Sequence, residues 1–153
     1  MKAAYINPFV DAVRRLFKTM LTLPVTIGPP ELNQEAKPRH DVCGVIAVAG
    51  EVNGQVVVSM MPPLAMSLAS ELLGDTVEQI DEDCLDAVGE IANMIAGNAK
   101  TDFPEGAGTI SVPSVVIGRD KVAYPRATPI ISIPCETGKG PLHIDVALKM
   151  GPI

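Results

Sequence analysis

The sequence has few aromatic residues: only 3% of its 153 residues are Phe, Tyr or Trp, and there is no Trp. The core must therefore be built from aliphatic side chains, and stacking platforms for nucleic-acid bases are lacking. Positive charge is not in excess either, since the formal net charge is −6 and the pI is near 4.8. Because phosphate-rich polymers and anionic membranes select clustered Lys and Arg, we expect neither as a partner.

Cysteine is sparse and irregularly spaced. Cys43, Cys84 and Cys135 are odd in number, far apart and free of any CxxC spacing, so we expect neither a disulfide framework nor a zinc site. Motifs for nucleotide binding, zinc proteolysis, serine hydrolysis and calcium loops are also missing. His40 and His143 have no metal-ligand partner at a suitable spacing, and we interpret each as a surface or hydrogen-bonded core residue. No metal and no cofactor of its own is predicted.

Long hydrophobic runs are missing as well, because no stretch approaches the ~20 apolar residues of a membrane helix. Arg14, Arg15 and Lys18 interrupt the apolar residues near the N-terminus, where no signal-peptide h-region is recognisable. We expect a cytoplasmic protein without membrane insertion. Its 47% apolar and 20% charged residues are typical of a globular chain, and the length fits a single domain over residues 1–153.

Helical signals occur in three segments. The first helix is predicted to start at Asn7-Pro8 and to end before Pro24, with its apolar residues on one face. The second covers 62–73 and stops before a glycine. The third and longest covers 81–100, with acidic residues in its first turn and a lysine at its end.

The remaining segments favour strands and turns. Val-rich and Ile-rich runs predict two strands at 41–52 and 55–61, joined at Asn53-Gly54, the strongest short hairpin signal. Residues 25–40 contain several prolines and are predicted to be extended or loop. Later β-rich runs are expected to form a meander over 109–118, 121–124, 128–135 and 142–148. These elements predict an α+β fold, in which an antiparallel-rich sheet packs with about three α-helices.

The 81–100 helix has two distinct faces when its residues are placed at about 100° intervals. On one side, spacings of four, three and four residues bring Asp86, Glu90, Asn93 and Gly97 within roughly 60° of one another. This outer stripe presents a carboxylate and an amide together. The opposite face is apolar and is expected to meet the core; it contains Cys84, Val88, Ile91, Ala92, Ile95 and Ala99.

Small residues flank the outer stripe, although a glycine costs about 1 kcal/mol relative to Ala inside a helix. Gly89, Ala96 and Gly97 would let the backbone of a partner approach closely while Glu90 and Asn93 project. The small residues can equally admit another helix of the same protein. The polar stripe itself can be an ordinary solvated face, because charged and amide side chains are mostly exposed in any globular protein.

The string from Asp86 to Ala99, DAVGEIANMIAGNA, resembles the signature of the CheC, CheX and FliY phosphatases. That signature is an Asp or Ser, a Glu four residues on and an Asn three further. The likeness extends from the helix ending Leu72-Leu73-Gly74 to residues 99–101. The sequence contains this signature once, and a single copy is most similar to the CheX-like branch of the family. The family pattern also has a proline downstream of the Asn, for which Pro113 is the candidate, a few residues early.

The resemblance implies a phosphatase that hydrolyses the aspartyl phosphate of a CheY-like response regulator in chemotaxis or two-component signalling. It implies catalytic roles for Asn93, which orients the attacking water, and for Glu90, which pairs with a receiver Lys. We further predict that Asp86, Gly89 and Gly97 contribute to partner binding. The receiver is expected to supply Mg²⁺, and the protein is expected to form a homodimer by sharing sheet structure. The alternatives are a non-catalytic adaptor or dimerisation module for a signalling or flagellar partner, and a small-ligand domain.

Overall fold

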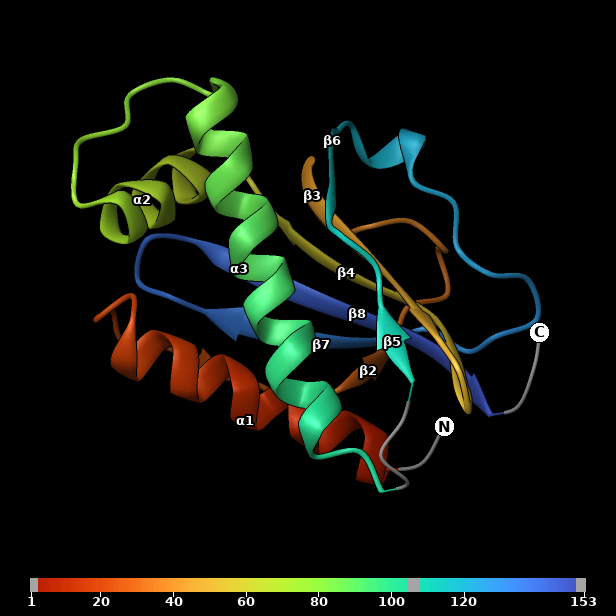
Figure 1. Ribbon diagram of the computed structural model, residues 1–153. Coiled ribbons are helices and arrows are strands. Elements are labelled where there is room, and N and C mark those ends of the chain that lie inside the picture. The colour runs from red at the N-terminus through yellow and green to blue at the C-terminus, as the bar shows by residue number, and fades with distance from the viewer. Residues whose placement is uncertain (1–2, 105–107, 151–153) are drawn as a thin grey trace.

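The computed structural model describes residues 3–104 and 108–150. In these residues three α-helices accompany an antiparallel sheet of eight strands (Figure 1). The α+β class predicted from the sequence is therefore confirmed. The helices are α1 (Ala3–Thr19), α2 (Pro62–Leu73) and α3 (Glu82–Thr101), and a short 3-10 helix, η1, covers Arg119–Lys121.

The strand order differs from the predicted meander. The sheet runs β1-β7-β8-β4-β3-β5, with β2 also paired to β7 and β6 also paired to β3. The C-terminal strands therefore divide between the two sides of the β3–β4 hairpin: β5 and β6 pair with β3, whereas β8 pairs with β4 and β7 pairs with β8. The strands are β1 (Thr26–Ile27), β2 (Glu31–Leu32), β3 (Val42–Ala49), β4 (Val52–Met60), β5 (Thr109–Ile110), β6 (Ser114–Ile117), β7 (Ile131–Glu136) and β8 (Pro141–Met150).

The β3–β4 hairpin forms, but Asn53-Gly54 is not its turn. Val48 pairs with Gly54, so the chain reverses around Gly50 and Glu51. The Asn53 side chain bonds back across the loop, accepting from Gly50 N at 3.2 Å and donating to Gly50 O at 2.8 Å. At Gly54 a Cβ would lie 1.9 Å from the Ala147 carbonyl oxygen of β8, so this glycine permits close strand pairing.

Helix α1 begins earlier than the sequence predicted. It contains Pro8 instead of starting there. Tyr5 and Phe9 both pack against Phe103, just beyond the end of α3, with ring centroids 5.3 and 5.8 Å apart. This tertiary contact stabilises the turn that precedes the proline, since helix stability in proteins comes mostly from packing of the apolar face.

Three further segments differ in detail from the prediction. The predicted strand at 121–124 is wrong, because these residues contain the end of η1 and an unpaired stretch. The 109–118 run is divided into β5 and β6. The 25–40 segment contributes β1 and β2 at the β7 edge. By contrast, α2 ends as predicted at Gly74, which adopts a left-handed conformation with φ 71°.

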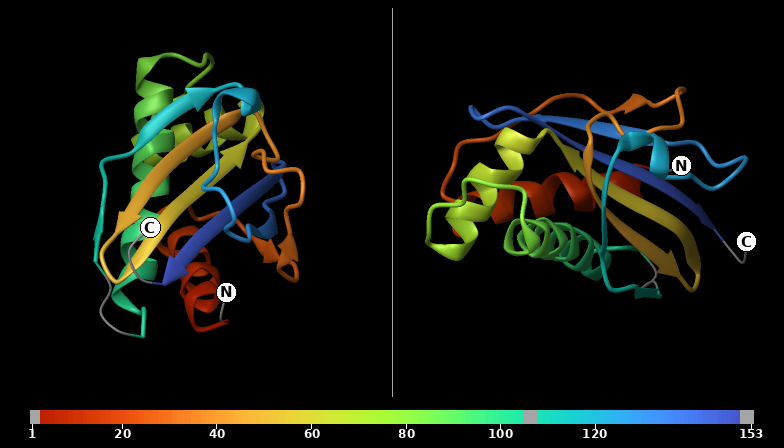
Figure 2. Two further views of the ribbon diagram at one scale, coloured as in Figure 1. Left: turned by 90° about the vertical axis from the view of Figure 1, so that its right-hand side faces the viewer. Right: turned by 90° about the horizontal axis from the view of Figure 1, so that it is seen from above.

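The helices cover one face of the sheet, and residues 33–41 and 118–130 lie over the other (Figure 2). One hydrophobic cluster joins the helices to the sheet, and α3 packs against α1, α2, β3 and β6. None of the described helices is long and apolar enough to cross a membrane. Because the predicted apolar face of α3 is buried throughout, its outer stripe faces the exterior. The buried residues of this face are Cys84, Val88, Ile91, Ala92, Ile95 and Ala99.

Candidate functional site

The N-terminus of α3 is held by its own capping residue. The Asp81 carboxylate accepts a hydrogen bond from Cys84 N at 2.9 Å and so satisfies one of the free N–H groups of the first turn. Glu82 and Asp83 lie in that first turn and Lys100 in the last, which complements the helix dipole at both ends. The helix that presents the outer stripe is therefore well defined by local interactions as well as by its buried face.

The outer stripe lies on the side of α3 opposite the core. Asp86 and Glu90 are exposed, whereas Asn93 and Gly97 are half-buried. Within residues 3–104 and 108–150, no hydrogen bond or ion pair engages the side chains of Asp86, Glu90 or Asn93. A carboxylate and an amide are thus available to groups from outside the protein.

Glu90 and Asn93 have complementary chemistry at short range. Residues three apart on a helix have Cβ atoms about 5–6 Å from each other. The carboxylate can bind a cation, while the amide can donate and accept hydrogen bonds at the same time. Cys84 cannot add a nucleophile here, because it faces the core and burial raises the pKa of its thiol. The stripe is suited to positioning and charge pairing.

Gly89 packs against the protein's own β5–β6 region. It is buried, and a Cβ there would lie 3.2 Å from Val115 Cγ2 and 3.4 Å from Pro113 Cγ. At Gly97 a Cβ would lie 3.8 Å from Ile110 Cδ1. The two glycines therefore allow a segment of the same protein to pack closely on α3. That segment is the β5–β6 region and not another helix. The partner-binding roles of both glycines stay predictions.

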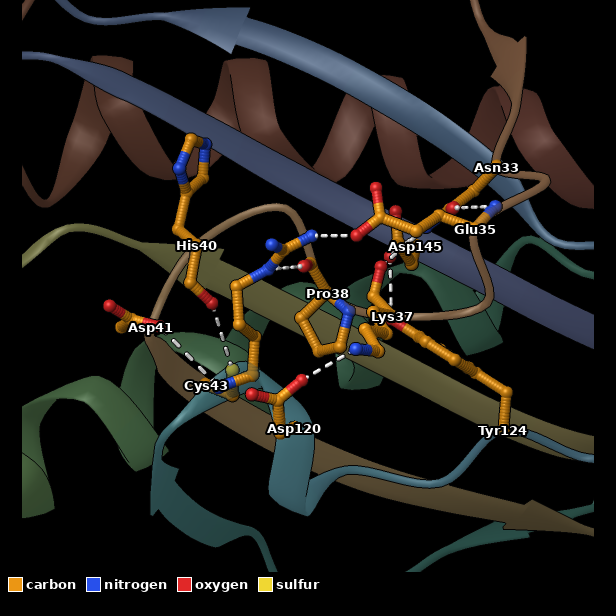
Figure 3. A network of polar contacts seen from close by, with 11 residues as sticks. Asn33, Glu35, Lys37, Pro38, His40, Asp41, Cys43, Asp120, Tyr124 and Asp145 are labelled. Carbon is orange, nitrogen blue, oxygen red and sulfur yellow. Dashed lines mark hydrogen bonds and ion pairs between the residues drawn. The ribbon is translucent and has the colours of Figure 1, made fainter.

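A second group of polar side chains lies on the opposite face of the sheet (Figure 3). The buried Asp145 carboxylate of β8 accepts hydrogen bonds from Asn33 Nδ2 at 3.0 Å and from the Tyr124 hydroxyl at 2.5 Å. Asn33 Nδ2 also donates to the Lys37 carbonyl at 2.8 Å. Two segments distant in sequence, 33–41 and 118–130, are thereby attached to one strand.

Further contacts join these two segments to each other. Arg119 Nε donates to the Pro38 carbonyl at 2.7 Å, and the Arg119 guanidinium pairs with Glu35. Lys37 and Asp120 form an exposed ion pair at 2.6 Å. In the described part of the chain, no three potential metal-ligating side chains come together. We interpret this network as an attachment of the covering segments to the sheet.

His40 and His143 contact each other, which their sequence separation did not indicate. His40 Nε2 and His143 Nδ1 are 2.8 Å apart. Burial, followed by the charge of His143, lowers the pKa of His40 to about 4. Burial also lowers the pKa of His143. Such a bond needs one nitrogen to accept, so the pair cannot be protonated on both facing nitrogens.

We expect the stability of the protein to fall as the pH decreases from 6.5 to 4, because unfolded His40 titrates near 6.5 and folded His40 near 4. In this interval the unfolded state binds more protons, so acid favours unfolding. With a discount for the partial exposure of His40, the loss is about 1–2 kcal/mol. Urea unfolding of wild type and His40→Gln at pH 7 and 4.5 measures it. If His40→Gln loses as much stability at the lower pH as wild type does, His40 is not the cause of the loss.

Known proteins share this architecture over nearly the whole chain. A CheC-like superfamily protein from Shewanella sp. PV-4 superposes with a TM-score of 0.86 and 28% identity, covering 97% of this chain and 99% of that one. A chain in the CheX–CheY–BeF3–Mg²⁺ complex from Borrelia burgdorferi gives a TM-score of 0.79 and covers 95% and 97% of the two chains. At 24% identity, that second likeness shows the fold. The structure therefore defines a protein of the CheC-like class.

The chain belongs to the family described as chemotaxis phosphatase CheX, whose model matches residues 42–136. The "CheY-P phosphatase CheX" of Thermotoga maritima is 28% identical over 123 residues, which are 78% of this chain and 79% of that protein. The resemblance inferred from the sequence is thus confirmed at the level of the family. The matched region includes Glu90, Asn93 and Pro113.

Proposed function

We propose that this protein hydrolyses the aspartyl phosphate of a CheY-like receiver domain and uses the outer stripe of α3 to do so. The observation that supports this most directly is the pair Glu90 and Asn93, which face outward without a partner in the described chain. Family membership supports the reaction, since the T. maritima relative is named a CheY-P phosphatase. The cytoplasm, where receivers act, is the proposed location.

The chemistry required of the phosphatase is small. Phosphoryl transfer passes through a loose transition state in which positioning and charge stabilisation dominate. The Asn93 amide is proposed to orient a water in line with the phosphoryl group. It cannot act as the base because an amide does not titrate in this range, so its contribution is geometric.

Glu90 is proposed to pair with the conserved Lys of the receiver. This ion pair would dock α3 on the receiver and keep the cation from competing for the phosphoryl group. Asp86, one turn before Glu90 and also exposed, adds negative charge to the same docking surface. The receiver is proposed to supply Mg²⁺, and the stripe needs no metal of its own.

The decay of a phosphorylated CheY-type receiver in Mg²⁺ tests the proposal. A substoichiometric amount of the protein is expected to accelerate the decay at least about tenfold, because one positioned group contributes on the order of 100-fold. The receivers encoded by the same genome form the panel. If the protein accelerates the decay of none of them, the phosphatase proposal fails.

We also propose that the protein forms a homodimer by pairing sheet edges. The sheet ends at β5–β6 on one side and at β1–β2 on the other, and open strand edges readily pair with another chain. Light scattering at micromolar concentration is expected to give twice the chain mass of 16.1 kDa. A mass equal to one chain at that concentration would contradict the dimer.

A further inference from the structure

The pairing of β5 and β6 with β3 contains a bulge beside the candidate site. Ile110 pairs with Val48, and Ser114 pairs with Val45. Residues 111–113 therefore place three residues opposite two residues of β3. Such a bulge re-aims a side chain and often lies next to a functional site.

Ser111 holds the backbone of this bulge in place. Its N–H donates to the Ala47 carbonyl at 2.9 Å, and its Oγ accepts from Ala47 N at 2.9 Å. The same hydroxyl donates to the Val112 carbonyl at 2.9 Å. Because the ladder is completed by these bonds, the neighbouring Val112 has a fixed backbone position.

Val112 is an apolar side chain presented to the outside. It is 83% exposed, more than any other large hydrophobic residue in the described chain. The residues on either side of it contact the protein itself: Ser111 is hydrogen-bonded to β3, and Pro113 packs against Gly89. The bulge thus turns one hydrophobic residue outward where a regular strand would continue along the sheet edge.

The bulge lies at the same height along α3 as Asn93. Pro113 lies against Gly89, one turn before Asn93, and Ile110 lies against Gly97, one turn after it. Val112 falls between those two contacts in sequence, so the bulge that carries it lies along the stretch of α3 that includes Asn93. Figure 1 shows β5 and β6 running alongside α3 over this length.

We propose that Val112 is an apolar docking contact for the receiver domain, next to Glu90 and Asn93. This inference rests on the proposed function. A specific interface covers about 800 Å² of each partner, so a receiver whose phosphorylated end meets Asn93 must also cover the adjoining bulge. Interfaces combine buried apolar anchors with polar pairs. Val112 supplies affinity, and Glu90 and Asn93 supply the chemistry.

The proposed occupant is the receiver, because the bulge that carries Val112 lies along the stretch of α3, from Gly89 to Gly97, that also carries the two side chains proposed to act on the receiver. Asp86 and Glu90 form the acidic part of the same surface and are exposed without a partner in the described chain, which suits the receiver Lys. A second copy of this chain at the same edge would bring the two acidic stripes together, and like charges oppose that contact, which leaves the β1–β2 edge for the proposed dimer.

Val112→Asp tests the contact, with Leu32→Asp as a matched control. Leu32 is also an exposed hydrophobic residue, at 56%, but it lies on β2 at the opposite edge of the sheet. Binding is measured to a CheY-type receiver loaded with BeF3⁻ and Mg²⁺, and turnover is measured on the phosphorylated receiver. Val112→Asp is expected to raise both the Kd and the half-saturating receiver concentration about tenfold or more. The rate at saturation should stay within about twofold, since Val112 does not touch the reacting atoms.

Each outcome separates the inference from the proposed function. Val112→Ile is expected to bind as wild type does, whereas Leu32→Asp should change neither quantity. If wild type binds and dephosphorylates the receiver and Val112→Asp does the same with unchanged constants, only this inference is overturned. It is also overturned if Val112→Asp converts a dimer to a monomer in light scattering without changing the receiver Kd. If wild type neither binds nor acts, the proposed function and the inference both fail.

Discussion

Asn93→Ala is expected to remove nearly all of the acceleration of receiver dephosphorylation, because one positioned transition-state group contributes on the order of 100-fold. The protein should remain folded, because the Asn93 side chain has no hydrogen-bond partner in the described chain and is only half-buried. Ala is also the better helix former, by up to ~0.7 kcal/mol. Less activity is thus expected together with equal or greater stability, measured by receiver decay and by urea unfolding.

Asn98→Ala is the matched control for this variant. Asn98 is half-buried on the same helix but lies off the outer stripe, and its backbone carbonyl, which the substitution keeps, accepts the bond from Thr101. This variant should retain wild-type turnover. If Asn93→Ala retains it as well, Asn93 is not the catalytic amide.

The comparison of Asn93→Ala with wild type also separates an enzyme from an adaptor. Asn93→Ala is expected to bind a BeF3⁻-loaded receiver nearly as well as wild type while failing to accelerate decay of the phosphorylated form. A protein that binds the receiver, does not accelerate decay in its wild-type form and is indifferent to Asn93→Ala would be an adaptor. Binding and turnover must therefore be measured on the same receiver.

Helix α3 was predicted from sequence to within one residue at each end, for physical reasons that are local. An acidic start with Asp81 as the cap, a 3.6-residue apolar period and a basic end all indicate the same boundaries. The direction of Glu90 and Asn93 then follows from the buried face. Their roles do not follow from that geometry, since a solvated stripe would look the same on a helical wheel.

The strand order could not be predicted in the same way. The pattern of a strand shows that one face is buried, but the partner is chosen by contacts between residues far apart in sequence. Asn53-Gly54 illustrates this limit. The dipeptide has the composition of a turn, yet Gly54 lies in β4 because β8 approaches it too closely for a side chain.

The His40–His143 contact and the bulge at Val112 were missed for a related reason. The two histidines are 103 residues apart and meet only through the covering segment. The bulge had a weak sequence signal, because Pro113 interrupts a β-rich run and proline is common where a ladder breaks. That signal indicated an interruption of the strand but could not show which side chain would turn outward.

Gly89→Leu and Gly97→Leu are expected to have opposite effects on the stability of the protein, although both place the same side chain on α3. At Gly89 even a Cβ would lie 3.2 Å from Val115 Cγ2 and 3.4 Å from Pro113 Cγ, so a leucine must displace the β5–β6 region. Overpacking of this kind costs about 2–3 kcal/mol. Urea unfolding should show the loss, and Gly89→Leu as stable as wild type would mean that the strand region does not need this close approach.

Among the described residues, a Cβ at Gly97 would meet only Ile110 Cδ1, at an ordinary contact distance of 3.8 Å. Replacing a helical glycine then changes stability by no more than about 1 kcal/mol, in the favourable direction. A leucine would nevertheless project from the outer stripe one turn beyond Asn93, where the receiver is proposed to lie. Gly97→Leu should therefore stay folded but bind the BeF3⁻-loaded receiver about tenfold more weakly or worse. Unchanged binding would mean that Gly97 is not part of the surface that contacts the receiver. The presence of glycine at both positions would then be explained by the packing of β5 and β6 along α3.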